Sequence, residues 1–503
     1  MLAASACGFG PPAAEPPSRS SSPEPSPTSA AASPSASSQG PEPVLATTYA
    51  TSSPSLKIDL IGLNRMAGKH LLVQLRLSNT ASGGRISWPG VLRDNFRAFG
   101  SEPVASGIAV LDTAERRWLL PYKPADRQCL CTDKNRDGVD YFIDGGDSVT
   151  VYAVLPAPSG DPDTATIVTP IGPPLVNAPI SDAAPVPPPG QEIPNPDDVE
   201  VSVVSHPFRA SSESLDKSEE SADDGENVEV SLSADVLFEV NKATLTGRAK
   251  AIITRTAEQV DRSQGATVEV AGHADSSGTH AINDPLSRRR AQAVQRMLES
   301  LVTRDGIEYE AKGYGSRRPL YSNSTDEGKR RNRRVTLTFA KPPPASPAPV
   351  ATTTPTPGND GMKATAREDG QNFALEVTGL RRLTGDLGVL TYTITNEGGE
   401  TAWYRPVGRG AEWMAYKYLA ASNVELTDQA AGRRYVPGHV IVGQEWREGE
   451  YCACSDLAGA RLGTTKFGPD VTKEFWGLFS LPPDGSSLTV KVATFSPLEV
   501  PIH

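Results

Sequence analysis

The clustering of proline is the feature that most constrains how this chain of 503 residues can fold. Three stretches combine Pro with Ser, Thr, Ala or acidic residues and hold few large apolar side chains. Such stretches cannot bury enough surface to offset the entropy lost on ordering. We therefore predict a disordered tether and two linkers, at 1–44, 181–226 and 342–361. The folded domains are predicted at 45–180, 227–341 and 362–503.

The sequences of the first and third of these domains look like copies of one another. In each, a glycine precedes an alternating apolar stretch that ends at an asparagine. The distance from Gly62 to Asn79 equals that from Gly379 to Asn396. Short alternating stretches, many turns and little helical periodicity are typical of β-sandwiches. We therefore predict a multidomain protein with two duplicated all-β sandwich domains.

The middle domain has a different pattern, in which apolar residues recur at helical spacing between short strands. One such stripe contains Ala249, Ile253 and Val260, and another contains Ala291 and Leu298. The predicted order is β-α-β-α-β-β, which forms a central α/β sandwich. Strands are predicted at 235–240, 267–272, 307–313 and 334–339, and helices at 245–260 and 287–302.

Four short motifs follow one another in the middle domain. They are Leu237-Phe238-Glu239-Val240-Asn241-Lys242, then Gly272-His273-Ala274-Asp275-Ser276-Ser277-Gly278, then Asn283 with Leu286-Ser287 and Arg290-Ala291, and finally Asn323, Glu327-Gly328 and Asn332-Arg333-Arg334-Val335. In this order and at these spacings, the segment 227–341 resembles the OmpA-like C-terminal domain, a peptidoglycan-binding module of many envelope proteins. The resemblance covers under a quarter of the chain. One departure is Ala274, where the family usually has Thr.

The resemblance implies a pocket for the diaminopimelate of the peptidoglycan stem peptide, with Asp275 and Arg290 at its centre. A carboxylate can accept from the ligand's ammonium, and a guanidinium can grip its carboxylate with two parallel hydrogen bonds. The alternative is that Asp275 and Arg290 form an ordinary structural ion pair. Asn283, Asn332 and Arg333 are further ligand-binding candidates, for which the alternative is a capping or structural role.

These features predict a cell-envelope protein that binds peptidoglycan non-covalently. The alternative hypothesis is an envelope adhesin or scaffold whose β-sandwich domains bind a protein partner. We predict no enzymatic activity: His273 and Asp275 could suggest acid-base chemistry, but no nucleophile or second carboxylate accompanies them in the motif. This also disfavours a wall hydrolase. The formal net charge of −11 argues against nucleic acid as a partner.

The first residues, Met1 to Gly8, resemble the end of a bacterial lipoprotein signal peptide. The resemblance implies that Cys7 is lipidated and tethers the chain to a membrane, and that the true start codon lies upstream. Ala4 stands where such signals prefer Leu, and the alternative is a chance Cys in a disordered tail. The predicted location is the extracytoplasmic envelope: the outer membrane if the host has one, otherwise the outer face of the cytoplasmic membrane and the wall.

The other cysteines form two C-x-C pairs at similar places in the two copies, which favours a structural role in an oxidising compartment. They either form tight local disulfides or pair across each sandwich. A zinc site would need four ligands, which each copy lacks. The disulfide candidates are Cys129, Cys131, Cys452 and Cys454.

One loop of the first copy resembles an EF-hand calcium loop, with oxygen-bearing side chains at alternate positions and a glycine at the turn. Its calcium-ligand candidates are Asp133, Asn135, Asp137 and Asp144. The alternative is an Asp/Asn-rich β-turn that binds no metal. No cofactor other than this calcium ion is expected.

Overall fold

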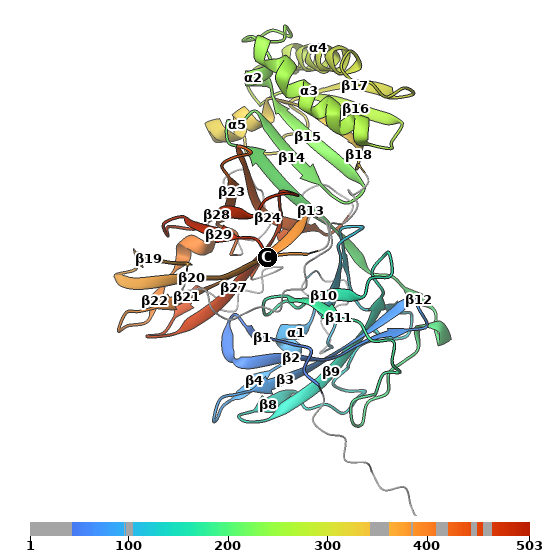
Figure 1. Ribbon diagram of the computed structural model, residues 1–503, viewed down its shortest axis with the longest axis vertical. Coiled ribbons are helices and arrows are strands. Elements are labelled where there is room, and N and C mark those ends of the chain that lie inside the picture. Colours follow the sequence, from blue (N-terminus) through green and yellow to red (C-terminus); the bar gives the residue numbers. More distant parts are fainter. Residues whose placement is uncertain are drawn as a thin grey trace, which may run out of the picture. The chain divides into compact units, whose positions relative to one another are not determined.

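The computed structural model describes residues 43–94, 96, 104–342, 362–383, 386–408, 421–443, 450–455 and 465–503 (Figure 1). Cys7 and nearly all of the predicted segments 1–44 and 342–361 lie outside these residues. None of the helices in the described part of the chain has the length and apolar character needed to cross a bilayer.

The first domain has two β-sheets whose apolar side chains meet in one core. Ile58, Leu75 and Ile167, from both sheets, are fully buried there. One sheet has the order β1-β2-β3-β9, formed by β1 (Ala46–Ala50), β2 (Ser53–Met66), β3 (His70–Asn79) and β9 (Ser148–Pro156). The other contains β11-β10-β5-β6, formed by β11 (Leu175–Pro179), β10 (Thr164–Val168), β5 (Ala109–Asp112) and β6 (Arg117–Leu119). Shorter elements are β4 (Arg85–Ser87), α1 (Pro89–Leu92), β7 (Lys123–Pro124) and β8 (Phe142–Asp144).

The C-terminal domain repeats this pattern of strand pairing. Phe373, Tyr392 and Leu426 lie in its core. One sheet has the order β19-β20-β21-β27, formed by β19 (Met362–Glu368), β20 (Gln371–Arg382), β21 (Leu387–Asn396) and β27 (Thr472–Ser480). The remaining strands are β22 (Ala402–Trp403), β23 (Val424–Asp428), β24 (Arg433–Ile441), β25 (Glu450–Cys452), β26 (Lys466–Phe467), β28 (Ser487–Val492) and β29 (Leu498–Pro501), and a 3-10 helix, η2, spans Arg405–Gly408.

The matching glycines and asparagines of the two copies have the same structural roles. The strand register shifts at Gly62 in β2 and at Gly379 in β20, so each glycine marks a β-bulge. The side-chain amides of Asn79 and Asn396 each donate to a backbone carbonyl oxygen, at 3.1 and 3.0 Å, and each side-chain oxygen accepts from the amide two residues later. These parallels support the interpretation that the two domains arose by duplication.

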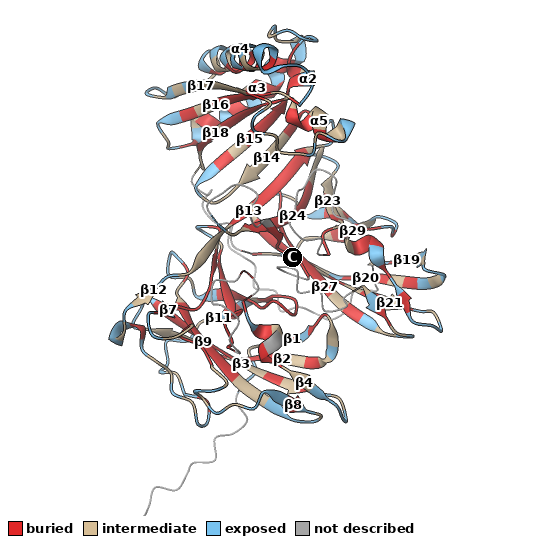
Figure 2. Ribbon diagram, turned by 180° about the vertical axis from the view of Figure 1, so that it is seen from behind, coloured by how far each residue is buried: buried red, intermediate tan, exposed pale blue. Residues whose placement is uncertain are grey.

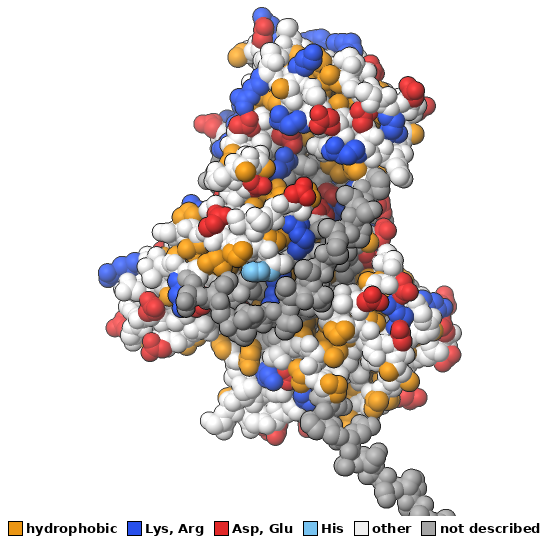
Figure 3. Space-filling view, viewed as in Figure 1, with side chains coloured by type: hydrophobic (Ala, Val, Ile, Leu, Met, Phe, Trp, Pro, Cys, Tyr) orange, Lys and Arg blue, Asp and Glu red, His pale blue; other side chains and the backbone are white. Residues whose placement is uncertain are grey.

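The middle domain is a sheet of order β15-β18-β16-β17 covered by helices α3 and α4 (Figures 1 and 2). The predicted apolar stripes are buried, including Ala249, Val260, Ala291 and Leu298. Its strands are β15 (Asn227–Ser233), β16 (Thr267–His273), β17 (Glu308–Gly315) and β18 (Arg334–Ala340). Its helices are α2 (Ala234–Leu237), α3 (Gly247–Arg262), α4 (His280–Glu299) and α5 (Asp326–Asn332). On the face shown in Figure 3, basic and acidic side chains are interspersed over this domain.

Two predicted boundaries in this domain are wrong. The first strand is β15, at 227–233, and not the predicted 235–240, because Val228, Val230 and Leu232 alternate and are buried. Helix α4 begins at His280, seven residues before the predicted start.

The predicted linker 181–226 is wrong from Pro196 onwards, where helical and strand elements form. It contains the 3-10 helix η1 (Pro196–Asp198) and the strands β12 (Val201–Ser202), β13 (Ser205–Ser214) and β14 (Glu219–Asp223). Strand β13 pairs with β6 of the first domain, with β24 of the C-terminal domain and with β14. Strand β14 pairs with β15 of the middle domain, so the hairpin β13–β14 joins strands of all three domains.

Two acidic residues of this hairpin, Glu213 and Glu219, are buried beside arginines. Glu213 is fully buried; its Oε1 lies 3.0 Å from Arg331 Nη2 of α5, and its Oε2 accepts from Arg434 Nε of β24 at 2.8 Å. Glu219, also buried, accepts from Arg433 at 3.0 Å. An acidic composition indicates a solvated linker only where no cations lie opposite, and here the cations come from distant parts of the sequence. We call these five residues the hairpin cluster.

We expect Arg331→Ala to lower the free energy of unfolding by about 3 kcal/mol or more, because it leaves a buried carboxylate without one of its partners. Urea titration monitored by circular dichroism measures this. The control is Arg248→Ala, which removes an exposed ion pair to Asp216 and should cost less than about 1 kcal/mol. Equal losses in both variants would contradict a structural role for the hairpin cluster.

Stability should also fall in acid through Glu327, whose pKa is held well below its usual value of 4.5 by hydrogen bonds from Arg330 and the charge of Arg331. A carboxyl with a lowered folded pKa stabilises the protein above its unfolded pKa and loses that contribution as pH falls. The difference in unfolding free energy between the wild type and Glu327→Gln should therefore be larger at pH 7 than at pH 3. Glu258→Gln, at an exposed position of α3, should show no such change.

Candidate functional site

The candidate site lies where β16 ends beside the N-terminal half of α4 and the start of β18. Asp275 follows β16 by two residues, Arg290 lies on α4, and Arg333 links α5 to β18. Two glycines let α4 lie directly on the sheet: a Cβ at Gly272 would overlap the backbone oxygen of Ser287, and one at Gly313 would overlap the backbone of the next residue of α4. Sheet and helix thus hold the site rigidly.

Asp275 is buried and pairs with Arg333, not with Arg290. Its Oδ1 accepts from the backbone amide of Ser277 at 2.8 Å, and its Oδ2 accepts from Arg333 Nη1 at 2.5 Å. The guanidinium of Arg333 also donates to both carboxylate oxygens of Asp235, at 2.8 and 2.7 Å. Its pKa is raised by its hydrogen bonds to Asp235 and Asp275. A direct Asp275–Arg290 ion pair, the structural alternative, is therefore not formed.

Arg290 is 8% exposed, and its side chain is only partly satisfied. Its Nε donates to the backbone oxygen of Lys242 at 3.0 Å, and its guanidinium lies 5.1 Å from the centre of the Phe238 ring. Burial lowers its pKa and the nearby Arg333 adds to this effect, while the charge of Asp235 acts in the opposite direction. Among the described residues, Nη1 and Nη2 have neither a hydrogen-bond acceptor nor an ion-pair partner. Two such terminal nitrogens on a held guanidinium are suited to an incoming carboxylate.

The two asparagine candidates organise the loops around Asp275. Asn283 Nδ2 donates to the backbone oxygen of Ser277 at 2.8 Å and so fixes the turn after Asp275. Asn332 is fully buried; its Oδ1 accepts from two amides of the loop before α5, and its Nδ2 donates to Asn323. The geometry of Asn332 fits the structural alternative, because both its polar atoms are already used within the protein.

His273 is buried against Tyr314, with the ring centres 5.4 Å apart. Burial lowers its pKa to about 2, and the nearby Arg334 and Arg318 add to the shift. The imidazole is therefore neutral at physiological pH and poorly suited to acid-base chemistry. Its Nδ1 has no hydrogen-bond partner within the described residues.

Sequence reasoning missed Asp235 and the ring of Phe238 as parts of the site. Phe238 and Lys242 lie within the first motif, so the motif carried a signal for them. Asp235 precedes the motif, and only the fold brings its carboxylate to Arg333.

Each C-x-C pair forms a local disulfide, Cys129–Cys131 and Cys452–Cys454, with a Cα–Cα distance of 5.3 Å in both. This resolves the alternatives that the sequence left open, because the cysteines do not pair across the sheets.

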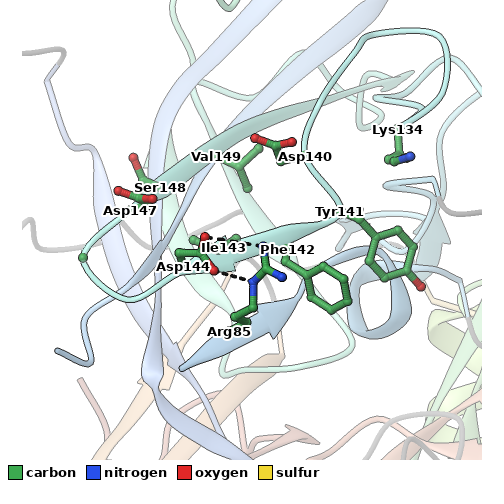
Figure 4. Close-up of a pocket in the computed structure, with 11 residues that line it drawn as sticks. Arg85, Lys134, Asp140, Tyr141, Phe142, Ile143, Asp144, Asp147, Ser148 and Val149 are labelled. Carbon is green, nitrogen blue, oxygen red and sulfur yellow. Dashed lines mark hydrogen bonds and ion pairs between the residues drawn. The ribbon is translucent and has the colours of Figure 1, made fainter. Parts of the chain in front are cut away.

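The loop in which oxygen-bearing side chains are spaced as in an EF-hand forms a turn. Asp133 Oδ1 accepts from the backbone amide of Asn135 at 2.8 Å, and Asp137 Oδ2 accepts from that of Asp133 at 2.8 Å. Asp144, the predicted closing ligand, pairs with Arg85 instead (Figure 4). No group of three or more acidic, His or Cys side chains in the described ranges is placed to hold a metal ion. The geometry thus favours the Asp/Asn-rich turn over the calcium site.

The sheet, its covering helices and the residues around Arg290 form an α/β domain of the class that the four motifs predicted. Residues 237–333 match the OmpA family, so the predicted resemblance is confirmed for this part of the chain.

The similar proteins match segments of comparable length. The chain is 38% identical over 106 residues to outer membrane porin F of Pseudomonas aeruginosa, across 21% of this chain and 30% of that protein. It is 35% identical over 104 residues to the peptidoglycan-binding protein ArfA of Mycobacterium tuberculosis, across 20% of this chain and 31% of that protein. Among solved structures, the cell wall anchor of the T6SS from Pseudomonas aeruginosa is 27% identical, with a TM-score of 0.23, across 25% of this chain and 90% of that chain. The match thus spans about a third of either curated relative.

We expect Gly272→Ala to lower the free energy of unfolding by about 1–3 kcal/mol, because the new Cβ would force α4 away from β16. Gly247→Ala is a matched control, since no atom lies within 4 Å of its new Cβ at the start of α3. It should cause no loss. Urea titration of both variants checks the close packing that holds the site, and a Gly272→Ala variant as stable as wild type would contradict it.

Proposed function

We propose that the middle domain binds peptidoglycan non-covalently and anchors the chain to the cell wall. The match of 237–333 to the OmpA family and the name of the mycobacterial relative support this. The relatives also support an envelope location. The further proposal that Cys7 carries a lipid, and so adds a membrane tether, comes from the sequence resemblance alone.

The ligand that we propose is the diaminopimelate of the stem peptide, whose free end carries an ammonium and a carboxylate. The observation that carries this is the buried guanidinium of Arg290, with Nη1 and Nη2 unpartnered within the described residues. The ligand's carboxylate would accept from both nitrogens in a bidentate pair. This would supply the acceptors that the buried cation lacks.

The ammonium would bind at Asp275. Each of its carboxylate oxygens already accepts one hydrogen bond, and each retains a lone pair for another donor. Arg333 keeps the Asp275 charge balanced when no ligand is bound, and Asp235 in turn balances Arg333. A zwitterionic ligand adds one charge of each sign, so the site binds it without leaving a net buried charge.

We expect Arg290→Ala and Asp275→Ala each to weaken retention on purified sacculi by at least about 30-fold, because each leaves one ligand charge without its buried partner. Arg290→Lys should also bind weakly, since an ammonium cannot form the bidentate pair. Co-sedimentation of the full chain with sacculi measures this.

The matched control is Arg289→Ala, which removes the same charge from an exposed position next to Arg290. It should bind as wild type does. The proposal fails if wild-type protein does not sediment with sacculi, or if folded Asp275→Ala/Arg290→Ala protein sediments equally well.

A further inference from the structure

A cavity lies in the first domain, apart from the candidate site around Arg290. It has a volume of about 640 Å³ and opens beside the paired strands β4 and β8 (Figure 4). This volume is within the range of about 300–1,000 Å³ that is common for small-ligand sites. It is lined by residues of β8, of the turn that follows β8, and by Arg85 of β4.

Two neighbouring aromatic side chains are exposed at this cavity. Tyr141 is 38% and Phe142 45% exposed, and their ring centres lie 5.0 Å apart (Figure 4). Aromatic rings are large apolar surfaces, and these two, whose planes are tilted by 58°, form an angled apolar surface that a ligand can cover.

Charges of both signs line the cavity, with Lys134 and Arg85 beside Asp140, Asp144 and Asp147, and such a lining favours an uncharged ligand with many hydroxyl groups. Arg85 lies over the Phe142 ring at 5.1 Å and pairs with Asp144, so the cation site on that ring is already filled. The carboxylates of Asp140 and Asp147 also line the cavity, and within the described residues neither makes a side-chain hydrogen bond or ion pair. They can accept hydrogen bonds from hydroxyl or amide groups.

A sugar chain combines these properties, because each ring has an apolar C–H face and hydroxyl donors at its edge. We propose that this cavity binds an N-acetylhexosamine glycan, the sugar strand of the polymer whose stem peptide binds at Arg290. The sugar's C–H face would lie over Tyr141 and Phe142, and its hydroxyls would donate to Asp140 and Asp147. This rests on the proposed function only for the source of the glycan.

Two contacts to one polymer strengthen attachment, because the second binding event becomes intramolecular. The stem-peptide site recognises a charged amino-acid end, whereas the β8 cavity would recognise the repeating sugar. The two would therefore bind different chemical parts of the same wall.

The test uses the full chain and chitopentaose, an N-acetylglucosamine oligomer without peptide, in isothermal titration calorimetry. Wild type should bind it saturably. Tyr141→Ala/Phe142→Ala should lose affinity by about tenfold or more, since it removes the stacking surface. Tyr49→Ala, which removes an equally exposed tyrosine (41%) outside the cavity lining, should bind as wild type does.

The two sites are separated by exchanging ligands and variants. Asp275→Ala/Arg290→Ala should bind chitopentaose normally, and Tyr141→Ala/Phe142→Ala should bind a soluble diaminopimelate-containing stem peptide normally. Absence of saturable chitopentaose binding by wild type, or unchanged binding by Tyr141→Ala/Phe142→Ala, would overturn the glycan proposal. Neither result would affect stem-peptide binding, which fails only if the stem peptide itself is not bound.

Discussion

The burial of Glu213 between arginines is the interaction on which the arrangement of the strands depends. An ionised carboxylate with no exposed surface is tolerated only if cations and hydrogen bonds replace its water. Arg331 of the middle domain and Arg434 of the C-terminal domain supply them. The buried carboxylates of the hairpin β13–β14 are therefore stabilised by segments more than a hundred residues away in the chain.

The same hairpin also contacts α5, the helix that leads into the candidate ligand site. Arg331 at the end of this helix binds Glu213 and Glu220, while Arg333, two residues later, binds Asp275. Asn332, between them, fixes the loop that precedes α5. Three consecutive residues thus connect the hairpin cluster, the loop before α5 and the candidate site. The position of Arg333 therefore depends on contacts made outside the middle domain.

Local patterns predicted the parts of the fold that local physics determines. The apolar side chains of α3 and α4 follow helical spacing. The glycines at the bulges and the asparagines at the ends of β3 and β21 occur at equal separations in the two copies. Strand β13 has no such signal: four of its ten residues are Ser, and its burial comes from partners elsewhere in the chain. Likewise, the motifs located Asp275 and Arg290, but the pairing of Asp275 with Arg333 required the tertiary structure.

Two buried arginines, Arg331 and Arg290, differ in how many of their guanidinium nitrogens have partners within the described residues. Each of the three guanidinium nitrogens of Arg331 is paired within the protein, with Glu213, Glu220 and Glu327. The guanidinium of Arg290 is held at Nε and against Phe238, while its two terminal nitrogens meet no acceptor among the described residues. The terminal nitrogens of Arg290 are not among the fully buried polar atoms without partners, so solvent reaches them. The carboxylate of the ligand proposed above would have the charge and geometry to replace that solvent.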